Sequence, residues 1–193
     1  GFRVEFNSAI GTLSDLVRVP DKYVQAIEAA MGSNLQLVLT EKSQVAKEML
    51  DHLTQHKHGR AGIVALEMLR QRGGEIPPND LPSEGKPALQ VLETDDRNRP
   101  LLQTLLGRTV IVDTLEAATR IWHSNPGRFD FVTLNGESLS QQGIYTGGKS
   151  SGNESERSSI LARRNQVENL EQQLTGLSQH IDESSRHKGQ LLA

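Results

Sequence analysis

Eight residues in the last third of the chain have the spacing of a phosphate-binding loop. The segment GIYTGGKS, Gly143–Ser150, fits the pattern G-x-x-x-x-G-K-[ST], in which backbone N–H groups and a lysine hold nucleotide phosphates. Such a loop needs a buried strand before it and a helix that begins at its Lys-Ser end. Here the preceding NGESLSQQ is polar, and the following SGNESERSS is a poor helix start. The sequence therefore favours a flexible glycine-rich turn, with a nucleotide-binding enzyme built on Lys149 as the alternative.

The same segment has a second interpretation that does not involve a nucleotide. Gly147 and Gly148 are adjacent, and a residue without a Cβ lets another backbone come close, as at an interface of paired strands. We therefore expect these two glycines to lie at a protein–protein contact rather than around a phosphate.

A row of possible metal ligands occurs earlier in the chain. Glu48, His52 and His56 follow one another at intervals of four residues, with His58 close by, and two histidines spaced i, i+4 on a helix can ligate zinc. The same pattern is typical of a solvated helix face, which is the interpretation we favour. The chain has no cysteine, no Ser-His-Asp pattern and no dinucleotide fingerprint. We expect no enzymatic activity, no metal and no cofactor in this chain.

Basic residues form two local groups in a chain whose net charge is −3. Positive charges near one another can contact nucleic-acid phosphates, and such binding is weak, independent of base sequence and sensitive to salt. No aromatic residues interleave these charges, so a base-stacking platform is not indicated. The alternative is that they are ordinary solvated charges. The candidate DNA-binding residues are Lys57, Arg60, Arg70, Arg72, Lys149, Arg163 and Arg164.

The elements that would position these residues form an internal repeat. Residues 26–67 and 102–137 each contain an apolar helix that ends at a glycine, a short apolar strand and a second helix. Both copies then contain Gly-Arg-x-x-x-Val-x-Leu, at Gly59–Leu66 and at Gly127–Leu134. Apolar strands alternating with helices are typical of sheets covered by helices. The sequence therefore predicts an α+β fold made of two small α/β lobes.

Element boundaries follow from local signals. The expected strands are Leu35–Leu39 and Thr109–Val112, and Thr40 and Asp113 are suitable N-cap residues for the helices that follow. The apolar face of each helix recurs at helical spacing. These faces consist of Val45, Met49, Leu50 and Leu53 in the first copy, and of Leu115, Ala118, Ile121 and Trp122 in the second.

A linker and a long helix complete the organisation. Arg70–Pro87 is rich in Pro and Gly and lacks periodicity, so we expect a loop. Residues 158–182 should form one helix, because apolar residues alternate at steps of three and four along a heptad seam that needs a partner helix. The seam consists of Val167, Leu170, Leu174, Leu177 and Ile181. The expected divisions are a first lobe at 1–85, a second lobe at 86–157 and a coiled-coil helix at 158–193.

Composition adds two expectations. Apolar residues make up 35% of the chain and aromatic residues 4%, which is low for one compact globule and agrees with an extended polar part. No apolar run approaches the roughly 20 residues that a membrane span needs, and Gly1–Phe6 has no apolar region of a signal peptide. We expect no contact with a membrane.

Taken in order, several segments resemble the hinge domain of bacterial SMC (structural maintenance of chromosomes) proteins. They are AIGTLSDLVRVPDKYVQAIEAAMGSNLQLVL, GRAGIVALEML, LLGRTVIVDTLEAAT, FDFVTLNGESLSQQGIYTGG and the return into a heptad helix, and they span nearly all of residues 8–193. In that family the hinge lies at the tip of a long antiparallel coiled coil, and two hinges join head to head into a small ring. The ATPase lies in head domains at the far end of the coil.

The resemblance implies a homodimerisation hinge of a chromosome condensation and partitioning ATPase, located in the cytoplasm on the nucleoid. Its implied partners are a second copy of itself, the other arm of its own coiled coil, and DNA bound weakly and without sequence preference. The residues expected at the dimer interface are Gly143, Thr146, Gly147, Gly148 and Gly11.

Overall fold

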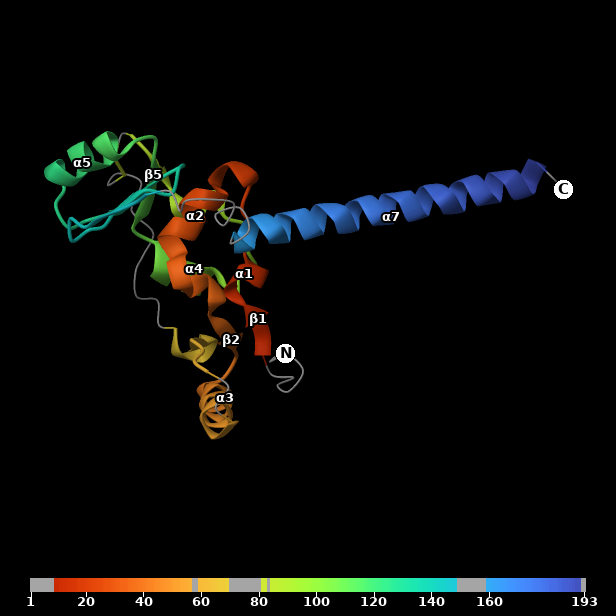
Figure 1. The fold of residues 1–193 in the computed structure, drawn as a ribbon, viewed down its shortest axis with the longest axis horizontal. Coiled ribbons are helices and arrows are strands. Elements are labelled where there is room, and N and C mark those ends of the chain that lie inside the picture. Colours follow the sequence, from red (N-terminus) through yellow and green to blue (C-terminus); the bar gives the residue numbers. More distant parts are fainter. Residues whose placement is uncertain (1–8, 57–58, 70–80, 83, 149–158, 192–193) are drawn as a thin grey trace.

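Two sheets, a layer of helices between them and one long helix make up the molecule. The computed structural model describes residues 9–56, 59–69, 81–82, 84–148 and 159–191. The sheets lie toward opposite ends of the globular part, and helix α7 (Ile160–Leu191) projects away from it (Figure 1). At about 1.5 Å per residue its 32 residues extend about 48 Å. The predicted C-terminal helix is therefore confirmed, and it runs beyond the expected end at residue 182.

The first sheet has the strand order β1-β2-β3. Strand β1 (Ala9–Thr12) is antiparallel to β2 (Val38–Thr40), and β2 is parallel to β3 (Ile63–Ala65). Helix α3 (Ser43–His56) joins the two parallel strands and packs on both of them. Its face toward the sheet is apolar, with Met49 and Leu53 buried.

The second sheet repeats this unit and extends it. Its strand order is β4-β5-β6-β7-β8, with β5 parallel to β6 and every other pair antiparallel. Helix α5 (Leu115–Ser124) connects the parallel pair, as α3 does in the first sheet. The internal repeat and the α+β class are therefore confirmed. The strands are β4 (Lys86–Pro87), β5 (Thr109–Val112), β6 (Asp130–Thr133), β7 (Ser138–Leu139) and β8 (Tyr145–Thr146).

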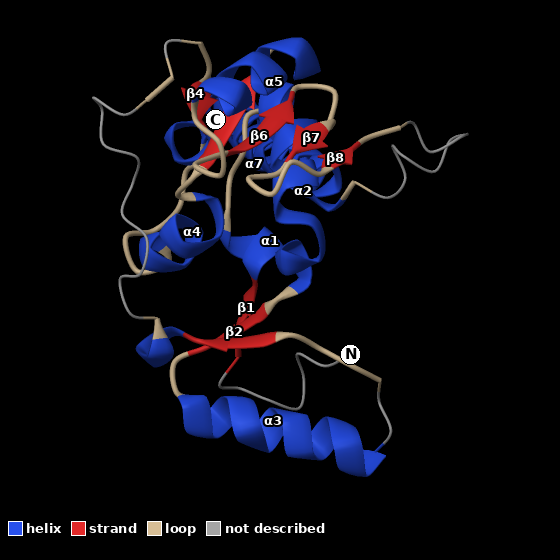
Figure 2. Cartoon of the chain, turned by 90° about the vertical axis from the view of Figure 1, so that its left-hand side faces the viewer, coloured by secondary structure: helices blue, strands red, loops and turns tan. Residues whose placement is uncertain are grey.

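Short helices fill the space between the sheets (Figure 2). Helix α2 packs on β6 of the second sheet and on α4, while α1 follows β1 directly. These helices are α1 (Leu13–Leu16), α2 (Val24–Met31) and α4 (Arg99–Leu106). Single 3₁₀ turns precede or follow them and the strands: η2 (Asp21–Tyr23), η3 (Gly32–Gln36), η4 (Leu66–Met68) and η6 (Ala88–Val91).

The larger hydrophobic core crosses the boundary expected between the lobes. Leu13 and Ile27 of the first lobe pack in one buried cluster with Leu102 and Val132 of the second. A smaller cluster lies between α5 and the second sheet, and it contains Val110, Val112, Ala118, Phe129, Phe131 and Leu139. The two repeats thus share one core, and α5 covers a second one by itself.

The backbone also joins the two lobes. Arg18 and Glu93 exchange two backbone hydrogen bonds, with N···O distances of 2.8 and 3.0 Å, and the hydroxyl of Thr94 donates to the carbonyl of Leu16 at 2.9 Å. These bonds tie the segment after α1 to the segment before α4.

Several expected boundaries are wrong by a few residues. The strand expected at Leu35–Leu39 begins only at Val38, because Gly32–Gln36 forms a 3₁₀ turn that places Leu35 in the core. Thr40 does not cap α3. It ends β2, fully buried, and its hydroxyl donates to the carbonyls of Lys42 and Val64 at 3.2 and 3.4 Å.

Two further expectations about local structure are corrected. Thr114, not Asp113, caps α5, since its hydroxyl accepts a hydrogen bond from the N–H of Ala117 at 3.2 Å. The end of the expected Arg70–Pro87 loop is a strand, because Lys86–Pro87 pairs with β5. The remainder of that loop lies mostly outside the described residues.

Candidate functional site at the sheet edge and the helix root

Strand β8 leaves one edge of the second sheet open. It pairs with β7 through Ser138 opposite Thr146 and Leu139 opposite Tyr145, and no described strand pairs with its outer side. An edge strand presents unpaired N–H and C=O groups that can accept a strand from another chain. Tyr145 is 55% exposed, so this edge is open to a partner.

Gly143 shapes the turn that leads into this edge. Its φ is +80°, and its N–H donates to the carbonyl of Ser140 at 2.9 Å. A Cβ on Gly143 would lie 3.4 Å from the ring of Trp122. Both the positive φ and the close aromatic ring favour glycine here. Gly143 is therefore required by the hairpin between β7 and β8 itself, and not by contact with a partner.

Gly147 and Gly148 follow β8 at the open end of the sheet. Gly148 has a φ of +116°, and a Cβ on it would meet no atom within 4 Å. A Cβ on Gly147 would lie 3.4 Å from Cγ of Glu137. Among the described residues no atom approaches this position, so within them only the backbone conformation of Gly148 requires glycine.

The nucleotide-loop alternative does not agree with this geometry. A phosphate-binding loop follows a buried strand of a parallel sheet and runs into a helix. Here Gly143 lies in a hairpin turn and Tyr145–Thr146 forms an exposed antiparallel edge strand. Lys149 and Ser150 lie outside the described residues.

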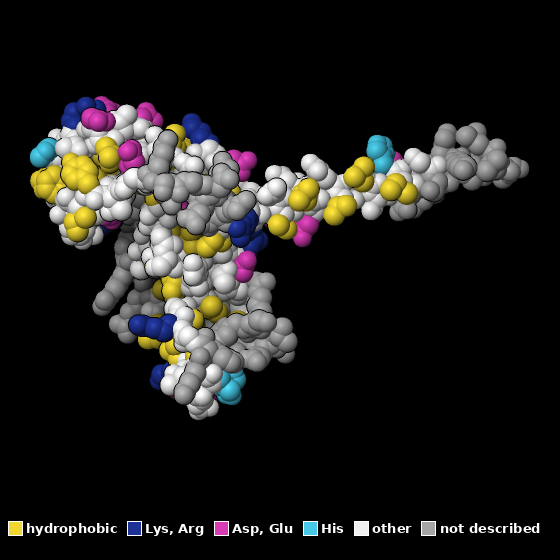
Figure 3. Space-filling model, in the orientation of Figure 1, with side chains coloured by type: hydrophobic (Ala, Val, Ile, Leu, Met, Phe, Trp, Pro, Cys, Tyr) yellow, Lys and Arg dark blue, Asp and Glu magenta, His cyan; other side chains and the backbone are white. Residues whose placement is uncertain are grey.

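An exposed apolar surface adjoins the β8 edge. Ile144 is exposed beside Tyr145, whose hydroxyl is hydrogen-bonded to the hydroxyl of Thr119 on α5 at 2.7 Å. Hydrophobic side chains gather over this end of the molecule (Figure 3). A hollow of about 420 Å³ lies next to it, lined by Leu115, Glu116, Thr119, Arg120, His123 and Tyr145.

Gly11 lies at an edge of the other sheet. It is part of β1, the outer strand, at an irregularity in the register between Ala9 and Gly11. Such a bulge twists an edge strand and changes its pairing. The expected interface residues are thus found at two separate sheet edges, four at or next to β8 and one on β1.

The first turn of α7 is anchored in the globular part. One carboxylate oxygen of Glu28 on α2 accepts hydrogen bonds from the hydroxyl of Ser159 at 2.9 Å and from the N–H of Leu161 at 2.8 Å. Because a helix N-terminus has free N–H groups and a partial positive charge, a carboxylate stabilises it. Leu161 is only 1% exposed and belongs to the larger core.

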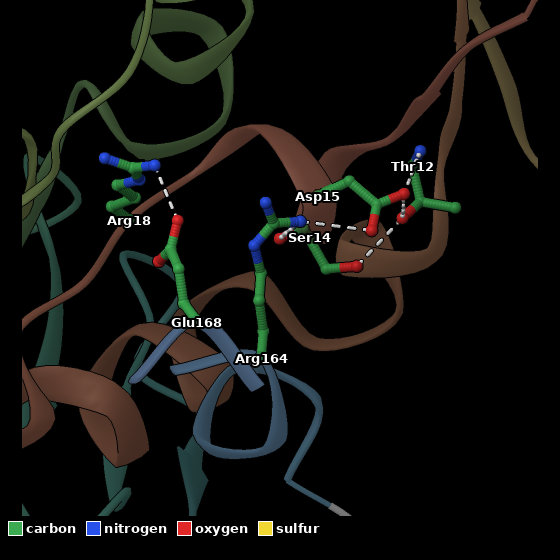
Figure 4. Close-up of polar contacts among 6 residues, drawn as sticks. All are labelled: Thr12, Ser14, Asp15, Arg18, Arg164 and Glu168. Carbon is green, nitrogen blue, oxygen red and sulfur yellow. Dashed lines mark hydrogen bonds and ion pairs between the residues drawn. The ribbon is translucent and has the colours of Figure 1, made fainter. Parts of the chain in front are cut away.

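The next two turns of α7 bind the segment that follows α1. The side-chain amide of Asn165 donates to the carbonyl of Val19 at 2.9 Å and to the carboxylate of Asp21 at 2.7 Å. Arg18 forms an ion pair with Glu168 at 2.5 Å (Figure 4). The anchored part of α7 therefore extends over about its first three turns.

Arg164 forms a partly enclosed contact with the segment of α1. Its guanidinium donates to Oδ1 of Asp15 at 3.1 Å and to the carbonyl of Ser14 at 3.4 Å (Figure 4). The side chains of Arg164 and Asp15 are only 31% and 33% exposed. The guanidinium expected to contact DNA is thus directed into the globular part, where it holds the root of the helix.

The other expected DNA contacts have different positions. Arg60 and Arg163 are exposed. Lys57, Arg70, Arg72 and Lys149 lie outside the described residues. Only these two of the seven candidates are described as exposed cations.

Beyond the root, α7 presents its heptad seam to the outside. All five seam residues are more than half exposed, from 52% to 65%. In Figure 3 apolar side chains follow one another along the projecting helix. A stripe of this kind is stable only when another helix covers it. The five are Val167, Leu170, Leu174, Leu177 and Ile181.

The histidine row on α3 is partly engaged within its own helix. The rings of His52 and His56 stack at 4.0 Å, and Nδ1 of His56 is hydrogen-bonded to the carbonyl of His52 at 2.9 Å. No group of three or more His, Asp or Glu side chains suited to a metal occurs within the described residues. Within the same residues, no helix has the length and apolar character that crossing a membrane requires.

Sequence reasoning did not identify the residues that hold the helix root. Asp15, Glu28 and Asn165 contact partners more than 130 positions away in the chain. No local pattern connects such residues. The only local signal is the position of Arg163 and Arg164 at the start of the heptad helix, and from it the sequence predicts DNA contact instead.

Comparison with known proteins adds an independent line of evidence. A family model described as SMC proteins Flexible Hinge Domain matches residues 6–122. Among curated proteins, the chromosome partition protein Smc of Lactiplantibacillus plantarum is 35% identical over 152 residues, which are 76% of this chain. The chain spans only 13% of the length of that relative.

Two solved structures are similar over most of the chain. The first is an asymmetric dimer of the Geobacillus stearothermophilus SMC hinge domain, with a TM-score of 0.79 and 26% identity, covering 95% of this chain and 74% of that one. The second is the Pyrococcus furiosus Smc hinge domain with an extended coiled coil, with a TM-score of 0.64 and 29% identity, covering 91% and 64%.

Proposed function

Because this chain belongs to the flexible hinge domain family of SMC proteins, we propose that it is the homodimerisation hinge of a bacterial chromosome condensation and partitioning ATPase. Its task is mechanical. It joins two coiled-coil arms so that a ring can form and open. ATP hydrolysis belongs to head domains elsewhere in the full protein, which acts in the cytoplasm on the nucleoid.

The observation that carries this proposal is the open β8 edge beside glycines. Within the described part of the chain, no strand pairs with the outer side of Tyr145–Thr146, and Gly147 and Gly148 follow without a side chain. Neighbouring strands lie about 4.8 Å apart, so a paired strand needs a surface that admits a backbone at this distance. The exposed heptad seam of α7 supports the second half of the proposal, which is that the domain continues into a coiled-coil arm.

We propose that the interface uses both sheet edges. A dimer with twofold symmetry presents the same surface from each chain, and the β8 end of one chain would face the β1 edge of the other. The residues proposed to contribute are Gly143, Thr146, Gly147, Gly148 and Gly11. The proposed domain boundaries are 1–85 for the first lobe, 86–157 for the second lobe and 158–193 for the arm.

Sedimentation of a double variant tests the dimer. Gly147→Glu with Gly148→Glu adds two negative charges at a contact that excludes water, and it strains a backbone with positive φ at Gly148. We expect the dimer dissociation constant to rise by several orders of magnitude, because each loss of about 1.4 kcal/mol in binding free energy raises this constant tenfold. The circular dichroism spectrum should stay unchanged, since neither glycine fills a core.

A matched control adds the same charges elsewhere. Gln172→Glu with Gly176→Glu places two carboxylates on exposed positions of α7, away from both sheet edges. This variant should dimerise like the unmodified protein. A Gly147/Gly148 variant that dimerises with unchanged affinity would remove these glycines from the interface.

We also propose auxiliary DNA binding without sequence preference. It is supported by the exposed guanidiniums of Arg60 and Arg163 and by the basic residues around them in the sequence. The guanidinium of Arg164 is bound to Asp15, so Arg164 is left out of the proposed phosphate contacts. The cations proposed to contact phosphates are Lys57, Arg60, Arg70, Arg72, Lys149 and Arg163.

A gel-shift series tests the DNA contact. Reversing Lys57, Arg60 and Arg163 to Glu should abolish a shift seen at low salt, and the affinity of the unmodified protein should fall steeply as salt rises. The control reverses a single charge elsewhere. Arg120→Glu should lower the affinity for DNA less than Arg60→Glu does, because Arg120 already forms an ion pair with Glu84 at 2.6 Å. Equal shifts for the triple variant and the unmodified protein would contradict the proposal.

A further inference from the structure

The carboxylate of Asp15 binds two different elements, one with each oxygen (Figure 4). Oδ2 accepts hydrogen bonds from the N–H and the hydroxyl of Thr12 at 3.0 and 2.8 Å. Oδ1 accepts from Nη1 of Arg164 at 3.1 Å. Thr12 is the last residue of β1, and Arg164 lies in the first turns of α7. One side chain therefore connects the end of a sheet edge to the root of the arm.

This connection is better enclosed than its neighbour on the same helix. About a third of each side chain is exposed in the Asp15–Arg164 pair, whereas in the other pair Glu168 is 27% exposed but the cation, Arg18, is 64% exposed. Ion pairs in open solvent contribute little because water screens them. Hydrogen bonds between charged groups that are partly enclosed are stronger.

The strand held by Asp15 is one of the two edges that the proposed dimer would use. β1 is an outer strand, and Gly11 at its irregular position directly precedes Thr12. The N–H of Leu13, on the other side of Thr12, donates to the carbonyl of Leu37 at 2.8 Å. A change in the direction of the Asp15 carboxylate therefore acts on a short strand that has little freedom to absorb it.

We infer that Asp15 is a positioning residue that couples the direction of the α7 arm to the β1 edge of the dimer interface. Tilting α7 away from the globular part withdraws Arg164 from Oδ1 of Asp15, so the carboxylate that binds Thr12 at the end of β1 loses its contact with the arm. By thermodynamic reciprocity, a partner bound at β1 favours the arm direction in which the pair is intact. The inference rests on the proposed dimerisation, but its first consequence concerns a single chain.

Two substitutions separate the arm contact from the strand contact. Asp15→Asn keeps an oxygen for the N–H of Thr12 and removes the charge that attracts Arg164. Arg164→Gln removes the cation and leaves Thr12 and Asp15 untouched. Each should raise the dimer dissociation constant about fivefold, the low end of coupling between sites. The double variant should lose no more dimer affinity than either single variant, because both substitutions remove the same contact.

The direction of the arm is measured by the distance between two spin labels. The chain has no native cysteine, so Gln44→Cys on α3 and Gln172→Cys on α7 give one labelled pair per chain, at exposed positions. Labelled protein is diluted with unlabelled protein so that only distances within one chain are read. The distance distribution should broaden in Asp15→Asn and in Arg164→Gln.

The matched control is Glu168→Gln, which breaks the ion pair with Arg18 on the same helix but does not touch β1. It should broaden the distance distribution while leaving the dimer dissociation constant within about twofold of the unmodified protein. Equal losses of dimer affinity in Glu168→Gln and Arg164→Gln would overturn the specific role of Asp15. So would independent, additive effects of Asp15→Asn and Arg164→Gln.

The two proposals fail in distinguishable ways. If the unmodified protein stays monomeric at every concentration, the proposed function fails, and the labels still report whether Asp15 directs the arm. If the dimer forms and the distance distribution is unchanged in both variants, the inference about Asp15 is wrong. Should Asp15→Asn fail to fold, Arg164→Gln carries the test alone, because it leaves the strand end intact.

Discussion

Three glycines within six positions have different roles in the hairpin that forms the open edge. Gly143 is needed inside the chain, since its φ is positive and the ring of Trp122 lies against it. A Cβ on Gly147 would contact Glu137, while a Cβ on Gly148 would meet no atom of the described residues within 4 Å. A side chain added at the glycines closest to the proposed partner should therefore disturb the packing of the isolated chain less than one added at Gly143.

Gly143→Ala tests this distinction at the level of one residue. We expect it to lower the free energy of unfolding by about 1–3 kcal/mol, because a side chain at positive φ is strained and the Cβ would lie 3.4 Å from Trp122. Thermal unfolding followed by circular dichroism measures the change. The control is Gly176→Ala, in an exposed helical position where alanine is favoured. Equal melting temperatures for the two variants would contradict the role of the turn.

At the scale of elements, α7 has two parts with different support. Its root is fixed by Glu28, by Asn165 and by the buried side chain of Leu161. Its outer part has no covering element among the described residues, and its seam is exposed. The same helix is thus part of the core at one end and a binding surface along the rest.

Truncation of two leucines of α7 should change the stability of the chain by very different amounts. Leu161→Ala removes a side chain that is 1% exposed, and we expect a loss of about 2–5 kcal/mol in the free energy of unfolding. Leu174→Ala removes one that is 65% exposed and should change the stability of the isolated chain by less than about 0.5 kcal/mol. Denaturant titration of both variants measures this, and a large loss in Leu174→Ala would indicate that the seam is already covered.

Hydrogen exchange should divide α7 at the end of its anchored part. Amides near Leu161 and Asn165 should exchange slowly, and those beyond Gln173 should exchange near the unprotected rate in dilute solution, because isolated helices are marginal in water. Protection of the outer amides should increase with protein concentration if the seam packs on another molecule. Slow exchange as far as Ile181 at high dilution would show that the arm is stable by itself.

The stability of the first turn of α3 should depend on pH. The N–H of Ser43 donates to Glu67 at 2.5 Å, and the hydrogen bonds from Ser43, first from its side chain and then from its backbone, lower the pKa of Glu67 below the ordinary 4.5. A lowered pKa means that the contact stabilises the fold above the ordinary value and is lost as the pH falls through the lowered one. Amides of the first turn of α3 should exchange faster at pH 3 than at pH 6, after correction for intrinsic rates.

Glu67→Gln provides the control for this pH effect. It should remove the pH dependence of the first turn, because glutamine does not titrate in this range. A first turn with the same pH dependence in Glu67→Gln would assign the effect to another group.

At the scale of the whole molecule, the repeat does not produce two independent units. Leu13 and Ile27 of the first lobe share a core with Leu102 and Val132 of the second, and Arg18 pairs with Glu93 across the boundary. The arm adds Leu161 to the same core. A force on the arm is therefore transmitted to both lobes.

Cutting the chain at the expected boundary should show this dependence. Residues 1–85 and 86–193 made separately should lack cooperative unfolding transitions, because each would expose part of the shared core. Mixed together they should recover a cooperative transition, measured by circular dichroism during heating. Cooperative unfolding of residues 1–85 alone would mean that the first lobe is independent.

Local signals in the sequence were sufficient for much of the fold. The periods of the apolar residues predicted the strand at Thr109–Val112 and the long helix, because each depends on near neighbours along the chain. The shared Gly-Arg-x-x-x-Val-x-Leu segments indicated the repeat. The resemblance of several sequence segments, taken in chain order, was sufficient to indicate the family. Leu50, expected on the apolar face of α3, is 44% exposed, because the small first sheet covers only part of that helix.

Only the tertiary structure decided what the charged residues do. Arg163 and Arg164 are adjacent and chemically alike, yet the first is exposed and the second is held by Asp15. Which of them turns inward depends on the path of α7 across α1, and this path joins residues 149 positions apart. Local sequence patterns report on neighbours along the chain, so a contact made by packing distant elements together is outside what they determine.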